Sequence, residues 1–193
     1  MDATADFAAV KQHLARPLPP YVSYEVVSHA GLGPFAKTEN GTIVVRTSDG
    51  KIVKGKAPNI QIGADSDSTY EGDIVTHPPF KPNCYEATSA QAATFEGRAV
   101  EEIRLHDTCD HGKGDGDFNR VYVDPESHEP IAAAGGNTDE QVVVHVTERI
   151  ERMADYFVPT SLNVTVKGSG WMAWLDVNAY EHISDYKFSN TAP

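Results

Sequence analysis

The densest group of side chains that could do chemistry lies in the stretch 105–117. Four candidate metal ligands fall there within six residues: His106, Asp107, Asp110 and His111. Imidazole and carboxylate groups bind zinc-type metals, so this group could hold a metal ion or serve a metal-dependent hydrolase. The spacing fits no standard zinc pattern, and the Asp- and Gly-rich residues that follow lack the order of a calcium-binding loop. A solvated acidic loop with Cys109 in a disulfide is the simpler prediction.

Patterns of nucleophilic catalysis and phosphate binding are missing from the sequence. No serine stands in the Gly-x-Ser-x-Gly context of a nucleophile elbow, and Gly168-Ser169-Gly170 is typical of a turn. Glu101 and Glu102 are adjacent, so in a strand they point to opposite faces and cannot act as a pair. We therefore predict a protein without enzymatic activity and without a cofactor.

The best binding candidates are large apolar side chains near the C-terminus. Taken as one strand, Trp171 to Tyr180 would place large side chains on both faces, more than one core face requires. A strand that lines an apolar cavity has this composition, and an ordinary core strand with one exposed tryptophan is the alternative. Apolar residues of the opening helix and of the strand that starts at Tyr156 join them. The predicted ligand-pocket residues are Trp171, Trp174, Met172, Leu175, Phe157, Phe7, Val10 and Leu14.

Composition limits the classes of partner. The 193 residues carry 16 basic and 28 acidic side chains, which gives a formal net charge of −12. Such a chain is repelled by phosphate backbones, so we expect no nucleic acid partner. No segment reaches the ~20 apolar residues that span a bilayer. We expect one domain that is not membrane-spanning and is large enough to bury a core.

Cys84 and Cys109 are the only two cysteines. Both lie in polar, loop-like surroundings, whereas buried thiols usually sit in apolar strands or helices. A disulfide between them is therefore expected, with two unpaired surface thiols as the alternative, and a disulfide would favour an oxidising compartment. Residues 1–7 do not form a secretory leader. Either the protein is cytosolic, or it is periplasmic or secreted and its leader is absent from this sequence.

Turn residues divide the chain into one opening helix and many strand-length pieces. Phe7, Val10 and Leu14 fall on one face of the helix predicted over 1–16, which prolines end. Ser48-Asp49-Gly50-Lys51 predicts a hairpin turn. Further along the chain we predict a short strand over 59–62 and an irregular Pro-rich region over 64–93, in which a short helix is an option near 89–93. Residues 142–147 are predicted as a strand because they are rich in β-branched residues, although helical spacing also fits them.

Alternation is clearest near the C-terminus. Leu162, Val164 and Val166 point one way, while the residues between them point the other. Val177 and Ala179 repeat the pattern after the turn at 168–170. These pieces predict a continuous antiparallel sheet.

The order of these pieces, most clearly from Phe118 to Phe188, resembles the outer-membrane lipoprotein-sorting (LolA-like) superfamily, especially its secreted bacterial members. The phrases that carry the resemblance are Val123-Asp124-Pro125 with Pro130, Tyr156 with Pro159, and Ile183 to Phe188. The resemblance implies an α+β fold over residues 1–193. In that fold a curved antiparallel half-barrel of about 8–11 strands, a typical size for a single sheet, wraps over the N-terminal helix.

The resemblance also implies a function. A member of this superfamily would be a non-enzymatic extracytoplasmic protein that holds a lipid, a lipoprotein acyl chain or another apolar small molecule between sheet and helix. Two other functions stay open. One is a metal-dependent enzyme at the 106–117 loop, and the other is an envelope scaffold with a filled core and no ligand.

Overall fold

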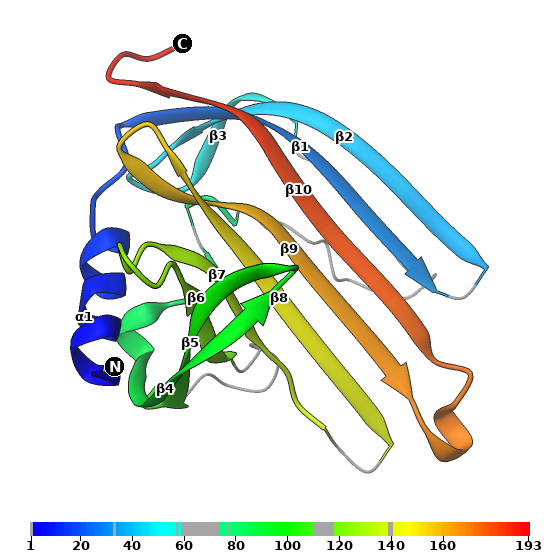
Figure 1. Ribbon diagram of the computed structural model, residues 1–193. Helices are drawn as coiled ribbons and strands as arrows, with labels where there is room; N and C mark the ends of the chain where they lie inside the picture. The colour runs from blue at the N-terminus through cyan, green and yellow to red at the C-terminus, as the bar shows by residue number, and fades with distance from the viewer. Residues whose placement is uncertain are drawn as a thin grey trace.

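The computed structural model describes residues 2–32, 34–56, 58, 74–76, 78–109, 118–138 and 141–193. Over these residues the chain forms an N-terminal helix, α1 (Ala3–Leu14), and a ten-stranded antiparallel sheet (Figure 1). In chain order the strands are β1 (Tyr21–Leu32), β2 (Phe35–Arg46), β3 (Lys51–Gly55), β4 (Tyr85–Phe95), β5 (Arg98–Asp107), β6 (Phe118–Val123), β7 (Pro130–Gly135), β8 (Val142–Met153), β9 (Tyr156–Gly168) and β10 (Asp176–Ser189). The predicted α+β fold with one curved antiparallel sheet over a helix is confirmed.

The strand order across the sheet is β3-β2-β1-β10-β9-β8-β7-β6-β5-β4. β3 and β4 follow one another in the chain and lie at opposite edges, while β10 lies between β1 and β9. In Figure 1 the long strands β8, β9, β10, β1 and β2 extend away from α1, and the shorter strands β4 to β7 curl beside the helix. The sheet therefore has a half that adjoins the helix and a half that projects beyond it.

The helix begins and packs as its sequence predicts. The Asp2 carboxylate accepts hydrogen bonds from the backbone N–H groups of Thr4 and Ala5, which an N-cap residue must satisfy. Phe7 and Val10 are buried against the sheet, and the main contacts of α1 are with β4, β5, β9 and the short 3-10 turn η1 (Pro82–Cys84). The helix thus closes one end of the interior face.

The core lies on the interior face of the sheet. Its largest fully buried side chains include Tyr24, Phe80, Tyr85 and Phe118. Phe80 packs against Tyr85 and Phe118, with ring centroids 5.5 Å away in each case. A smaller cluster on the outer face contains Val100, Tyr122, Ala132 and Ala134, so the sheet around β5 to β7 is apolar on both sides.

Two expectations about local structure are wrong. The strand predicted from Trp171 to Tyr180 begins only at Asp176, because Gly170–Met172 form a 3-10 turn, η2. Gly170 adopts a φ of 58°, and a Cβ on Gly168 would lie 1.8 Å from the Met172 carbonyl oxygen. The close approach excludes any side chain at Gly168, and the positive φ at Gly170 favours glycine there.

The Pro-rich region also ends earlier than expected. Residues 85–95 form β4, so neither an irregular segment up to residue 93 nor a helix near 89–93 is present there. The alanine-rich composition favours helix, but pairing with β5 from Tyr85↔Asp107 to Phe95↔Arg98 overrides that preference. The strand predicted over 59–62 lies outside the described residues. The strand predicted over 142–147 is confirmed and continues to Met153.

Cys84 and Cys109 form a disulfide. It joins η1 to the segment that follows β5, where the Thr108 N–H also donates a hydrogen bond of 2.8 Å to the Cys84 carbonyl oxygen. The bridge therefore fixes the entry to edge strand β4 against its neighbour β5.

Replacing both cysteines with serine is expected to lower the free energy of unfolding by about 3 kcal/mol. The bridge closes a loop with a sequence separation of 25, and opening it restores that conformational entropy to the unfolded chain. Urea denaturation of the double variant measures the loss. The reduced parent protein is the matched control and should lose a similar amount; equal stability of oxidised and reduced parent protein would contradict the prediction.

Candidate functional site

Apolar side chains form a belt across the interior face of the projecting half of the sheet. We call these residues the interior belt: Val144, Val146, Val164, Val166, Val177, Ala179, Ala30 and Leu32. They come from four adjacent strands, β8, β9, β10 and β1. Ala30 and Val146 are buried, and the other six are half-buried.

Strand register aligns the belt in two rows. Val144 pairs with Val166, Val166 with Val177, and Val177 with Leu32. One step closer to the helix, the second row runs Val146, Val164, Ala179 and Ala30. Residues paired across antiparallel strands share a face, so each row is continuous.

The belt is an extension of the core face. Val146 is a member of the main core cluster, and Val164 packs against that cluster. The cluster also contains Phe7 and Val10 of α1, so the belt faces the side of the sheet on which the helix lies. Half-buried branched aliphatic side chains gathered on one inner face form a surface that can desolvate hydrocarbon.

Two buried carboxyl groups mark the boundary between the belt and the packed core. Glu148 and Glu181 both pair with Leu162, one from each side. Their exposed fractions are 1% and 5%. Glu148 accepts a hydrogen bond of 2.8 Å from the Phe80 N–H, which ties the segment before β4 to the interior of β8. Burial raises the pKa of Glu148 to about 8, while the Phe80 hydrogen bond acts to lower it.

The ligand-pocket residues predicted from sequence separate into two groups. Trp171 and Trp174 lie in the connection between β9 and β10 and are 71% and 67% exposed, with Met172 and Leu175 half-buried beside them. The other four belong to the helix end of the interior: Phe7 and Val10 are buried in the core, and Leu14 and Phe157 pack against it. The interior belt lies between these two groups.

The metal ligands predicted around residue 106 are not brought together within the described residues. His106 is exposed on β5, and the following residue Asp107 accepts the Cys109 N–H at 2.8 Å. Cys109 is in the disulfide and cannot bind a metal as a thiolate. Asp110 and His111 lie outside the described residues.

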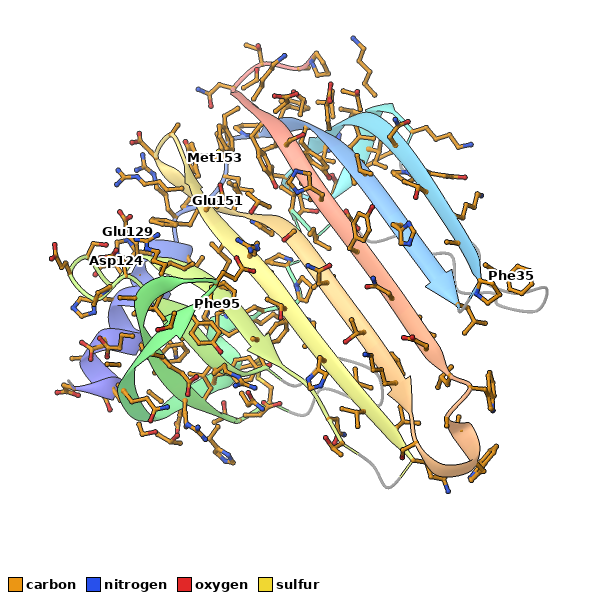
Figure 2. All side chains as sticks on the ribbon, turned by 45° about the vertical axis from the view of Figure 1, so that its right-hand side comes forward. Phe35, Phe95, Asp124, Glu129, Glu151 and Met153 are labelled. Carbon is orange, nitrogen blue, oxygen red and sulfur yellow. A yellow bond between two sulfur atoms is a disulfide. The ribbon has the colours of Figure 1, made fainter. Side chains whose placement is uncertain are left out.

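A hollow of about 480 Å³ lies outside the belt, near the turn between β8 and β9, where Phe95 of the outer cluster and Phe157 of the helix end both line it. Figure 2 shows Phe95, Asp124, Glu129 and Glu151 in this region, near the end of β8. Its charges are paired, as the contacts Arg98–Asp124 at 2.5 Å and Arg152–Glu129 at 3.0 Å show.

Hydrogen bonds favour the ionised form of Asp124 in this hollow. Backbone N–H groups of Ser127 and Glu126 and the Arg98 side chain lower the pKa of Asp124 to about 2. Phe157 is the predicted pocket residue that lines this hollow. A second outer hollow, about 300 Å³, is lined by Glu102, Arg104 and Arg120 among others. Both outer hollows are polar and suit hydrocarbon less well than the belt.

A third group of polar side chains lies beside α1. Asp6, Glu101 and His128 bring one ligand atom each within 4.8 Å of the others. Burial, and then the adjacent Asp6 carboxyl group, raise the pKa of Glu101 above its ordinary value. This cluster could not be predicted from the sequence, because the three residues lie in three separate elements and match no motif.

Part of the interior belt was visible in the sequence. The alternation of Leu162, Val164 and Val166 on β9 is as predicted, and Val177 and Ala179 continue it on β10. Ala30 and Leu32 were not identified, because only the pairing of β1 with β10 places them beside these valines.

Comparison with known proteins identifies the fold. No protein-family model and no curated protein matches the sequence. A DUF1329 family protein from Desulfovibrio piger aligns with a TM-score of 0.54 and 9% identity, over 100% of this chain and 96% of the other. A domain from Vibrio parahaemolyticus assigned to outer membrane lipoprotein sorting aligns with a TM-score of 0.51 and 11% identity, over 100% and 95%.

A LolA superfamily protein from Nitrosomonas europaea is also similar, with a TM-score of 0.45 and 9% identity over 100% of this chain and 96% of the other. The alignment with the Vibrio parahaemolyticus domain confirms the resemblance to lipoprotein-sorting proteins at the level of the fold. Among the described residues, no helix is both long and apolar enough to cross a bilayer.

Proposed function

We propose that this protein, which has the fold of an outer membrane lipoprotein-sorting domain, is a non-enzymatic carrier of an acyl chain or a similar lipid. The ligand lies along the interior belt, on the inner face of the sheet beyond the helix. The observation that carries the proposal is the continuity of this apolar surface across four strands.

The size and chemistry of the belt suit a hydrocarbon chain. Three steps between neighbouring strands of ~4.8 Å each give a width of about 14 Å. Each buried methylene group contributes about 0.8 kcal/mol, so a chain of several methylenes gains enough to bind reversibly. The half-buried state of Val144, Val166 and Val177 means that they still have surface to bury against a ligand.

A further feature supports a carrier outside the cytoplasm. The Cys84–Cys109 disulfide is of a kind that persists in oxidising compartments such as the periplasm.

Placing a charge within the belt tests the proposal. The Val166→Asp variant is expected to bind palmitate at least tenfold more weakly than the parent protein. A carboxylate in the belt would have to lose its water when the hydrocarbon binds, and that desolvation costs more than 1.4 kcal/mol. Displacement of a fluorescent fatty acid measures the affinity, and native mass spectrometry detects lipid that co-purifies.

The matched control is Thr165→Asp, which puts the same charge one residue away on the outer face, opposite His145 and Asn178. It should bind palmitate as the parent protein does. The proposal fails if the parent protein neither binds palmitate nor carries co-purified lipid. It also fails if the two variants lose affinity equally.

A further inference from the structure

Three side chains from separate parts of the chain meet beside the helix. Asp6 lies in the first turn of α1, Glu101 lies on β5, and His128 lies in the turn between β6 and β7. One ligand atom of each lies within 4.8 Å of the other two, and His128 Nδ1 is 3.6 Å from Asp6 Oδ1.

Each of these side chains keeps one buried polar atom without a hydrogen-bond partner in the part of the chain that the structure describes, although the carboxyl groups of Asp6 and Glu101 interact with one another. Asp6 Oδ2, Glu101 Oε1 and His128 Nδ1 are buried atoms without a hydrogen-bond partner among the described residues. Glu101 itself is only 4% exposed. A buried polar atom without a partner costs on the order of 1–3 kcal/mol, and a charged group costs more. Three such atoms in one place therefore indicate a missing common partner.

The same sheet satisfies its other buried acids. Glu148 accepts the Phe80 N–H at 2.8 Å. Glu102, on the opposite face of β5 from Glu101, accepts a hydrogen bond from the Gln91 side chain at 3.0 Å and pairs with Arg104 at 3.3 Å. Glu101 instead faces another carboxyl group and an imidazole.

We propose that Asp6, Glu101 and His128 bind one divalent transition-metal ion, and that zinc fits this set of ligands best. Two carboxylate oxygens and one imidazole nitrogen are ordinary zinc ligands, and a water molecule would complete a four-coordinate site. Tetrahedral coordination at bond lengths near 2.0–2.1 Å separates ligand atoms by about 3.4 Å. The 3.6 Å between His128 and Asp6 is close to this separation, and a bound metal would require the other ligand atoms, which lie within 4.8 Å of one another, to approach it as well.

The site lies just below the surface: its unpartnered atoms are buried, while other parts of the Asp6 and His128 side chains reach solvent. The Asp6 and His128 side chains are 13% and 33% exposed, while Glu101 forms the floor. A metal held here would connect α1 to β5 and to the β6–β7 turn. This inference is independent of the proposed acyl-chain site, because no residue of the interior belt takes part.

Zinc titration of the whole protein tests the site. Isothermal titration calorimetry after chelator treatment should show one zinc ion bound per chain, and thermal unfolding should shift to a higher midpoint with zinc. The Glu101→Gln variant keeps the shape of the side chain and should bind zinc at least 100-fold more weakly. His128→Gly should do the same, since glycine accepts the φ of 55° at this position.

Two controls separate this site from other zinc ligands. Glu102→Gln changes the neighbouring acid on the outer face, and His106→Ala removes the histidine of the 106–117 loop. Both should bind zinc as the parent protein does. Unfolding midpoints measured with chelator establish that the two site variants are folded. Absence of zinc binding by the parent protein, unchanged affinity in Glu101→Gln and His128→Gly, or loss of the site in His106→Ala would overturn the proposal.

Discussion

At pH 8 the Glu148→Gln variant is expected to be more stable than the parent protein by about 3–5 kcal/mol, with little difference at pH 4. Glu148 is buried on the interior face of β8, and its carboxyl group accepts the Phe80 N–H. Burial raises its pKa from 4.5 to about 8. Glutamine remains neutral at every pH and keeps an oxygen that can accept the same hydrogen bond.

The sign follows from the protons bound in each state. In the unfolded chain Glu148 ionises near its ordinary pKa, whereas in the folded protein it stays protonated up to about pH 8. Over that interval the folded state binds one more proton, so stability falls as pH rises, by up to about 1.4 kcal/mol per pH unit. The stability that the protonated Glu148 contributes is therefore complete below the pKa of the unfolded state. It is lost as the pH rises through the pKa of the folded state.

Urea denaturation at pH 4, 6 and 8 measures the effect. Comparison of variant with parent protein isolates Glu148, because Glu101 and the other acids contribute equally to both. Glu151→Gln on the same strand is the control, since Glu151 is exposed and should change stability little at any pH. A parallel pH profile for Glu148→Gln and the parent protein would contradict the prediction.

Replacing Phe80 with alanine is expected to lower the free energy of unfolding by about 3–5 kcal/mol. Phe80 is 2% exposed and packs between Tyr85 and Phe118, so its removal opens a cavity among rigid aromatic rings. The loss should appear as a lower urea midpoint with an unchanged denaturant slope.

The comparison with Phe35→Ala makes this test specific. Phe35 begins β2 and is 77% exposed, so its truncation should change stability by less than about 0.5 kcal/mol. A Phe80→Ala variant as stable as Phe35→Ala would mean that the segment before β4 does not hold the core together.

Much of the sheet could be predicted from turn motifs and from the alternation of apolar and polar residues. Both patterns depend only on residues that are neighbours in the sequence. Asp49-Gly50 gives the turn between β2 and β3, where Gly50 has a φ of 65° and Asp49 pairs with Arg46. The alternation from Leu162 to Val166 needs only the two-residue period of a strand to show which face is buried. Features of this kind do not require knowledge of the fold.

The features that could not be predicted from the sequence depend on contacts between residues that are distant in the chain. The alternation near Trp171 suggested a strand, yet the flanking glycines turn the chain and leave both tryptophans exposed. Alanine-rich residues 85–95 favour helix until β5 supplies a pairing partner. The cluster of Asp6, Glu101 and His128 forms only because the helix lies against β5, so no spacing of residues in the sequence predicts it.

The position of β10 has a consequence for how the protein is made. Of the ten described strands this one is synthesised last, yet it lies in the middle of the sheet. Tyr21 to Leu32 of β1 pair with it on one side and Ser161 to Lys167 of β9 on the other. Until β10 has left the ribosome, β1 of the β1–β3 unit and β9 of the β4–β9 unit each present an unpaired strand edge. Such a chain is prone to wrong pairing during biogenesis, and a chaperone that covers those edges until the final strand arrives would act at the most vulnerable step.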